Sequence, residues 1–139
     1  MDIKFTVPGP PKSKARHRTT KEGIQYTPKE TVQYENLVKM GFREKYKGEP
    51  WQGPVVAKIV AIYPIPKSAS KAKRQLMEYL VIRPHSKPDC DNIAKVILDS
   101  LNQIAFRDDA QVYMLAVSKM YGTTPQVWVQ LIFQEGSSK

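Results

Sequence analysis

The chain has few of the residues that build disulfide frameworks, zinc sites or membrane spans. It contains one cysteine, Cys90, and two histidines, His17 and His85. One cysteine excludes an internal disulfide, and neither histidine has a second histidine or cysteine at the spacing of a zinc site. The sequence also lacks an apolar run of the roughly 20 residues that a transmembrane helix needs, and it lacks a signal-peptide pattern. We therefore expect a cytoplasmic protein that keeps its cysteine reduced and contacts no membrane.

Acidic residues are scarce compared with basic ones. The 139 residues include 22 lysines and arginines but 13 aspartates and glutamates, which gives a formal net charge of +9. Polyanions are the natural partners of a protein with this charge. The hydrophobic fraction of 41% and the charged fraction of 25% are those of an ordinary globular protein, so disorder is not expected. The length predicts a single domain over residues 1–139.

The pattern of apolar residues predicts a small set of strands and helices. Segments rich in alternating or β-branched apolar residues are expected to be strands at 3–7, 55–63, 112–120 and 127–133. Segments with helical spacing are expected to be helices at 27–47, 68–80 and 92–104, the second with Leu76, Tyr79 and Leu80 facing the core. A turn at 21–23 predicts a short hairpin before the first helix. This order favours an α+β fold, in which helices pack on one face of a mixed sheet.

The stretch from Lys87 to Val112 carries the residues with the clearest chemical potential. Asp89 and Asp91 flank Cys90 after a proline, in a segment that we expect to be extended. Alternation would then point both carboxylates to one side and turn Cys90 away from them, as a small buried hydrophobe. In the helix that follows, Lys95 lies one turn beyond Asp91 on the polar side.

A second acidic pair, Asp108 and Asp109, follows this helix and precedes the next predicted strand. We expect a strand–helix–strand return to bring Asp109 back near Asp89 and Asp91. Three or four converging carboxylates would repel one another unless protons or a hard cation neutralised them. Ligation by oxygen atoms suits Mg²⁺ or Mn²⁺. One interpretation of the stretch is therefore a site for a divalent metal ion.

A purely structural interpretation of the same residues is equally compatible with their spacing. Asp91 would cap the helix, and Asp89 would lie favourably near its positive N-terminal end. Asp99 would pair with Lys95 one turn earlier, and the later aspartate pair would form a turn. Spacing by itself leaves both interpretations open.

A row of basic residues precedes the predicted hairpin. Its members alternate along the chain: Lys12, Lys14, Arg16 and Arg18. In an extended backbone they project from one side, which suits a DNA phosphate backbone because Lys and Arg neutralise it and release counterions. The alternative is a sheet edge that charges protect from aggregation. We favour DNA contact, because the row has one sign and the whole protein is basic.

Together, these motifs resemble the RusA family of Holliday junction resolvases. The resemblance rests on Lys-Pro-Asp-x-Asp-Asn, on a lysine four residues after the second aspartate, on the apolar helix, and on Asp-Asp-Ala-Gln-Val. It is strong from Lys87 to Val112 and looser from Pro8 to Tyr34, and the stretch from Gly48 to Ser86 does not contribute to it.

The resemblance implies a function and an assignment of roles. Asp89, Asp91 and Asp109 would be metal ligands, with Asp108 as the ambiguous neighbour, and Lys95 would be the catalytic lysine. The family resemblance further implies a homodimer that uses Mg²⁺, or Mn²⁺, to cut four-way DNA junctions by paired symmetric nicks in DNA recombination and repair. Bound metal would orient a water and neutralise charge on the scissile phosphate.

Two other functions compete with this one. A non-catalytic basic DNA-binding protein would use its aspartates to brace the helix and its basic row to hold phosphate. A nucleotide-sugar transferase would bind a diphosphate through its Asp-x-Asp motif, but the chain is small and shows no nucleotide-binding domain. Cleavage of a synthetic junction with Mg²⁺ would favour the nuclease over the non-catalytic DNA-binding protein. Failure to bind any DNA would favour the nucleotide-sugar transferase.

Overall fold

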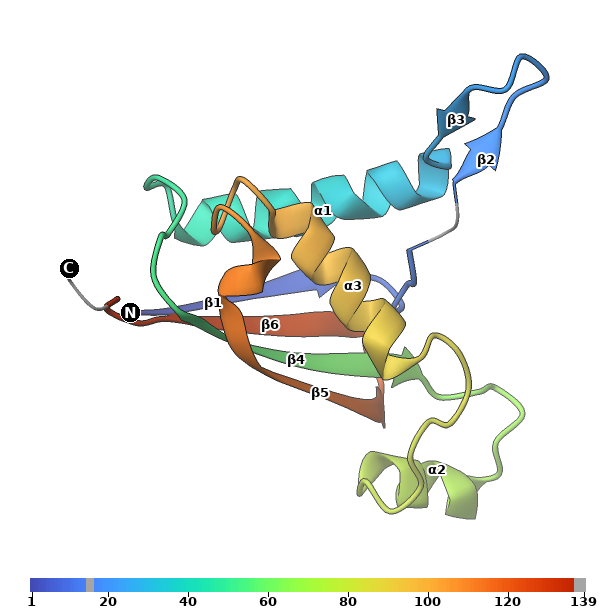
Figure 1. Ribbon diagram of the computed structural model, residues 1–139. Helices are drawn as coiled ribbons and strands as arrows, with labels where there is room; N and C mark the ends of the chain where they lie inside the picture. The colour runs from blue at the N-terminus through green and yellow to red at the C-terminus, as the bar shows by residue number, and fades with distance from the viewer. Residues whose placement is uncertain (15–16, 137–139) are drawn as a thin grey trace.

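The computed structural model describes residues 1–14 and 17–136 of the chain. Its main feature is a four-stranded mixed sheet with the strand order β1-β6-β4-β5 (Figure 1). The strands are β1 (Asp2–Pro8), β4 (Val55–Pro64), β5 (Val112–Gly122) and β6 (Gln126–Phe133). β6 is antiparallel to β1 and β4, whereas β4 and β5 are parallel. The predicted α+β fold with one mixed sheet is confirmed.

The described residues form three α-helices, and two of them cover one face of this sheet. These two are α1 (Lys29–Lys45) and α3 (Cys90–Leu101), while α2 (Lys71–Glu78) lies near the ends of β4 and β5 (Figure 1). The predicted hairpin is formed by β2 (Arg18–Thr19) and β3 (Gln25–Tyr26). No helix in the described part of the chain is long and apolar enough to span a bilayer.

The core lies between the sheet and the helices α1 and α3. Along β1, Ile3, Phe5 and Val7 are buried and their neighbours are exposed, and Phe5 lies opposite Val129 of β6. The helices contribute apolar stripes: Tyr34, Val38 and Phe42 from α1, and Ile93, Val96, Ile97 and Leu101 from α3. Gly41 lets α1 approach β1 closely, because a Cβ there would lie 2.9 Å from a ring carbon of Phe5. The helix predicted at 92–104 is confirmed, although it begins at Cys90 and ends at Leu101.

Helix α2 differs from its prediction in its start and in its buried side. It begins later than predicted, with Ser70 as its N-cap. The prediction that Leu76, Tyr79 and Leu80 face the core is wrong, because all three are exposed and Met77 is the buried residue of the helix. The helix contacts the edge strand β5, and an apolar pattern alone does not say which element covers it.

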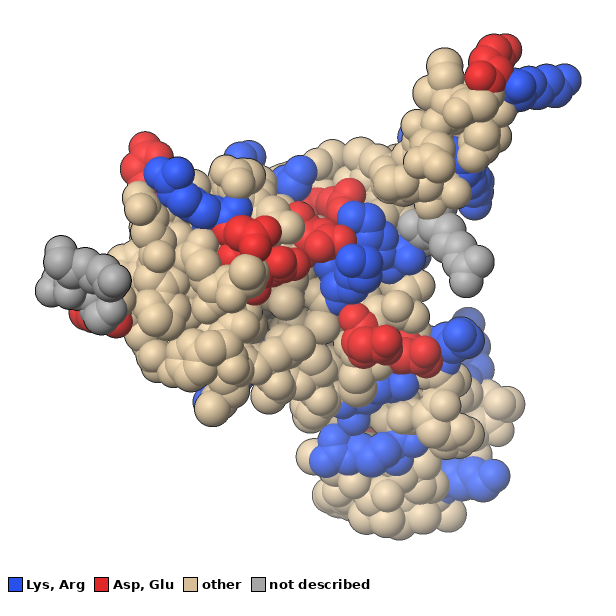
Figure 2. Space-filling view, in the orientation of Figure 1, with Lys and Arg blue, Asp and Glu red and all other residues tan. Residues whose placement is uncertain are grey.

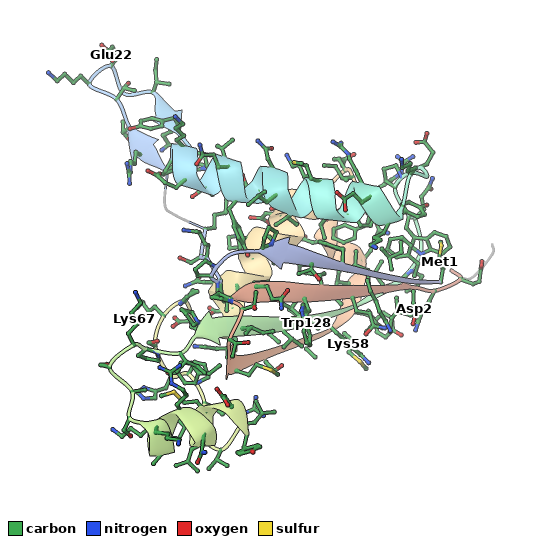
Figure 3. All side chains as sticks on the ribbon, turned by 180° about the vertical axis from the view of Figure 1, so that it is seen from behind. Met1, Asp2, Glu22, Lys58, Lys67 and Trp128 are labelled. Carbon is green, nitrogen blue, oxygen red and sulfur yellow. The ribbon has the colours of Figure 1, made fainter. Side chains whose placement is uncertain are left out.

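The other side of the sheet is an open face. On β4, β5 and β6 its side chains alternate with those of the core: Gln126, Trp128, Gln130 and Ile132 of β6, Val56, Lys58, Val60 and Ile62 of β4, and Met114, Ala116, Ser118 and Met120 of β5. Val56 and Ile62 are buried even on this face. Figure 3 shows Lys58 and Trp128 on this face, with α3 behind the sheet. Lys58 is the one charged residue that β4, β5 and β6 contribute to this face, and β1 adds Asp2 and Lys4.

Candidate active site

The two aspartates of the Asp-Cys-Asp motif lie at the N-terminal end of α3. Asp89 is the N-cap residue, with an extended backbone (φ −73°, ψ 158°), and Asp91 lies in the first turn. Both residues are exposed. The prediction of an extended segment through Asp91 is wrong, because the helix already begins at Cys90. The two carboxylates therefore project from the start of one helix, where the partial positive charge of the helix end stabilises them.

The first turn of α3 also changes the roles expected of Cys90 and of the cap. Cys90 is exposed, and its thiol lies 3.9 Å from the Val117 carbonyl oxygen, so the prediction of a buried cysteine is wrong. The structural interpretation made Asp91 the cap, but Asp89 occupies that position. Within the described residues, its carboxylate accepts no capping hydrogen bond. Capping therefore does not account for the aspartate pair.

Lys95 follows Asp91 by one turn and pairs with Asp99 one turn further on. Its ammonium lies 3.5 Å from Asp99 Oδ2, and its side chain is 64% exposed. The salt bridge of the structural interpretation is thus present. An exposed pair of this spacing contributes only about 0.3–0.5 kcal/mol, so it leaves the Lys95 ammonium free to move to a stronger anion.

Lys14, a member of the predicted DNA-binding row, is held by the same carboxylate. Its Nζ donates a hydrogen bond to Asp99 Oδ2 at 2.9 Å and lies 3.7 Å from Glu35 of α1. The hydrogen bond to Asp99 raises the pKa of Lys14 above its ordinary value, against the opposing effect of burial. Lys14 therefore ties the N-terminal segment to α3 and α1, and it is not the free cation that the predicted row assumed.

The rest of the row has a different environment. Lys12 and Arg18 are exposed, and Arg16 lies outside the described residues. Figure 2 shows acidic side chains gathered on the side of the molecule that carries α3, with basic side chains beside them and over α2. A DNA backbone that approached the acidic end of α3 would therefore meet basic side chains around it, but contact with DNA stays a prediction.

Asp109 lies at the opposite end of α3 from Asp89. Its backbone amide donates a hydrogen bond to Asn102 Oδ1 at 2.9 Å, and Asn102 is the C-cap of the helix. At 1.5 Å per residue, the helix separates its two caps by about 20 Å. The prediction that the chain returns Asp109 to Asp89 and Asp91 is wrong within one chain. Asp108 instead caps the short 3₁₀ turn η1 (Asp109–Gln111), where its carboxylate accepts a hydrogen bond from the Ala110 amide.

The strand directions explain this separation. Because β4 and β5 are parallel, Val112 at the start of β5 lies opposite Val55 at the start of β4. The turn before Val112 therefore lies at the amino ends of β4 and β5. The loop before α3 lies at their carboxyl ends, beyond Tyr63. The side chain of Gln111 fixes the turn in place, since its amide donates hydrogen bonds to the carbonyl oxygens of Trp51 and Gly53.

The described residues contain no group of three or more histidine, cysteine, aspartate or glutamate side chains arranged to hold a metal ion. The expected three-aspartate site is therefore not formed within one chain. The pair Asp89 and Asp91 still suits Mg²⁺, because this ion commonly binds one or two protein carboxylates together with substrate phosphates. Two carboxylates are a donor set that such an ion accepts.

Two side chains near Asp89 were not singled out from the sequence. Tyr63 and Lys119 bond to the loop that precedes α3. They occur near the ends of two predicted strands. That position could have pointed to them, because sites often form beyond the carboxyl ends of parallel strands. The sequence did not show that these two strands are parallel neighbours.

Comparison with known proteins assigns the class of the molecule. Residues 8–132 match the family model described as Endodeoxyribonuclease RusA, so the chain belongs to the RusA family of endodeoxyribonucleases. It is also similar to the uncharacterized protein YqaN of Bacillus subtilis (strain 168), with 34% identity over 134 residues that cover 93% of this chain and 94% of that protein. The family resemblance is confirmed, and the chain is an enzyme that cuts DNA.

Proposed function

We propose that this endodeoxyribonuclease resolves four-way DNA junctions by paired symmetric nicks, with Mg²⁺ bound at the start of α3. The observation that carries the proposal is the exposed pair Asp89 and Asp91, one helical turn before Lys95, in a chain of this family. Mn²⁺ prefers similar oxygen ligands and is expected to substitute. A role in DNA recombination and repair and a cytoplasmic location stay predictions.

Asp89 and Asp91 would hold the metal, and a phosphate oxygen of the DNA would complete its coordination. When bound, the ion would lower the pKa of a water molecule and neutralise charge on the scissile phosphate. The two carboxylates would offset the partial positive charge of the helix N-terminus, which by itself disfavours a cation. The predicted role of Asp109 as a third ligand stays a prediction, and the proposed site consists of Asp89 and Asp91.

Lys95 would stabilise the negative charge that develops on the phosphate. Its exposed ammonium extends from the same side of α3 as Asp91, and its present partner Asp99 is a weak surface contact at 3.5 Å. A phosphate carries more charge than one carboxylate and would compete well for this cation. A positioned charge at such a transition state typically contributes about 10²–10³ in rate.

The basic row would position the DNA. Lys12 and Arg18 are exposed and available to phosphates, and the net charge of +9 favours DNA at long range. Lys14 would act indirectly, by holding the N-terminal segment against Asp99. Arg16 stays a predicted contact.

We also propose that the enzyme acts as a homodimer. Two symmetric nicks need two sites, and each chain supplies one pair of Asp89 and Asp91. The open face offers a surface for a second copy, because Trp128 is 48% exposed and Met114 55% exposed. A two-fold axis would pack the same face of both copies together.

The experiment that tests the function compares four-way junction, flap and linear duplex DNA, each with and without Mg²⁺, on a denaturing gel. We expect paired symmetric nicks in the four-way junction that depend on the metal. Equal cleavage of all three substrates would mean a nuclease without junction specificity. Tight junction binding without cleavage in either Mg²⁺ or Mn²⁺ would favour the non-catalytic DNA-binding alternative.

A further inference from the structure

The loop that leads into α3 passes the carboxyl ends of β4 and β5. These strands are parallel, and the register pairs Pro64 with Gly122 at these ends. Ligand sites of sheets with parallel strands commonly form beyond the carboxyl ends of those strands. Tyr63 and Lys119 reach the loop from here, and their alternation with exposed or open-face neighbours places both on the helix-covered side.

Each of these two side chains holds one carbonyl group of the loop. The Tyr63 hydroxyl donates a hydrogen bond of 2.6 Å to the Pro88 carbonyl oxygen. The Lys119 ammonium donates one of 2.7 Å to the Ser86 carbonyl oxygen. The same ammonium lies 5.1 Å from the centre of the Tyr63 ring, as a cation–π contact. The backbone is therefore anchored on both sides of Lys87.

The Tyr63 hydroxyl is suited to a role as a donor. The residue is 7% exposed. Its hydroxyl contacts the Pro88 carbonyl oxygen, which can only accept a hydrogen bond, so the anchoring bond needs the hydroxyl proton.

The anchored backbone leads directly to Asp89. In the described chain, the Asp89 carboxylate accepts no capping hydrogen bond, so its place is set by the backbone of Pro88 and Asp89 itself. We propose that Tyr63 and Lys119 are positioning residues, which hold the Asp89 carboxylate where it can share a metal ion with Asp91. This inference rests on the proposed function, since it takes Asp89 as a metal ligand. Both residues act through the loop and not on the DNA.

The test uses variants that remove one donor each and keep most of the packing. Tyr63→Phe removes the hydroxyl and keeps the ring, and Lys119→Met removes the ammonium and keeps an unbranched side chain. Tyr121→Phe is the matched control, because Tyr121 lies opposite Tyr63 in the register, whereas the two anchoring bonds of the loop come from other residues.

The measurements are the Mg²⁺ dependence of four-way junction cleavage and the junction affinity without metal. Partners that orient metal ligands typically contribute about 10–100-fold to metal affinity. We therefore expect both variants to need about tenfold more Mg²⁺ for half-maximal cleavage. Their rates should recover at saturating Mg²⁺, and their junction affinities should match that of the wild type. A merely structural role would lower rate and affinity without moving the Mg²⁺ dependence.

The outcomes separate this inference from the proposed function. If the wild type does not cut the junction with Mg²⁺ or Mn²⁺, the proposed function fails and the positioning role fails with it. If the wild type cuts, and Tyr63→Phe and Lys119→Met show the same Mg²⁺ dependence as Tyr121→Phe, the positioning role is overturned and the proposed function stands. A Lys119→Arg variant keeps a cationic donor and should need less Mg²⁺ than Lys119→Met.

Discussion

Lys14 and Lys95 contact the same carboxylate oxygen, and their removal should have opposite consequences. Their ammonium groups lie 2.9 Å and 3.5 Å from Asp99 Oδ2, but the side chain of Lys14 is 24% exposed and that of Lys95 is 64% exposed. We predict that Lys14→Ala lowers the stability of the fold and leaves the chemical step intact. Lys95→Ala should slow the chemical step and leave the stability of the fold nearly unchanged.

The burial of the Lys14–Asp99 pair sets the size of the effect. A hydrogen bond to a charged group typically contributes about 1.5–3 kcal/mol, and partial exposure reduces this to about 1–2 kcal/mol for Lys14→Ala. A chain of this length unfolds with an entropy of about 0.29 kcal/mol/K, so the Tm should fall by about 3–7 °C. Lys95→Ala loses an exposed pair of about 0.3–0.5 kcal/mol, which corresponds to about 1–2 °C.

The pH dependence of stability provides a second check on Lys14. Its pKa is raised in the folded protein from the ordinary value of 10.5. The stability that its charge contributes is then fully present below the unfolded pKa and is lost as the pH rises through the folded pKa. The difference in unfolding free energy between the wild type and Lys14→Ala should therefore be constant near neutral pH and shrink above about pH 10.5.

Thermal unfolding and single-turnover junction cleavage at saturating Mg²⁺ and enzyme measure the two effects separately. Lys14→Ala should cut at nearly the wild-type rate. Lys95→Ala should cut about 10²–10³ times more slowly, because it loses a cation at the phosphate. The reasoning would be refuted if Lys95→Ala lowered the Tm as much as Lys14→Ala, or if it cut the junction at the wild-type rate.

Five further substitutions test the metal site, the DNA contacts and the dimer. Asp89→Asn or Asp91→Asn should abolish cleavage and leave junction binding intact or tighter, and parallel titrations that show equal loss of both would indicate a structural role. Lys12→Ala or Arg18→Ala should each reduce the slope of log affinity against log salt by about 0.9, and an unchanged slope would exclude a phosphate contact. Trp128→Glu should shift the sedimentation from dimer to monomer, and a wild-type monomer with full activity would contradict the dimer.

The local elements and the family could be predicted from residue patterns. Alternation predicted β1, because successive side chains of a strand point to opposite faces, and a dense run of β-branched and apolar residues predicted β4. The apolar stripe of α3 could be predicted equally well, because residues three and four apart share one face of a helix. The family motif between Lys87 and Val112 could be recognised for a related reason: most of it lies within one helix and its flanks, where spacing along the chain fixes spacing in the molecule.

Which distant groups meet depends on how the strands and helices pack together. Asp109 follows α3 closely in the sequence, yet the parallel pairing of β4 and β5 places it at the opposite end of that helix from Asp89. Lys14 finds its partner Asp99 across 85 residues of chain, and Lys119 reaches the loop before α3 from the end of β5. Local periodicity encodes which side of an element is buried, but strand order and direction determine what lies against it, because they arise from pairing between segments that are far apart in the chain.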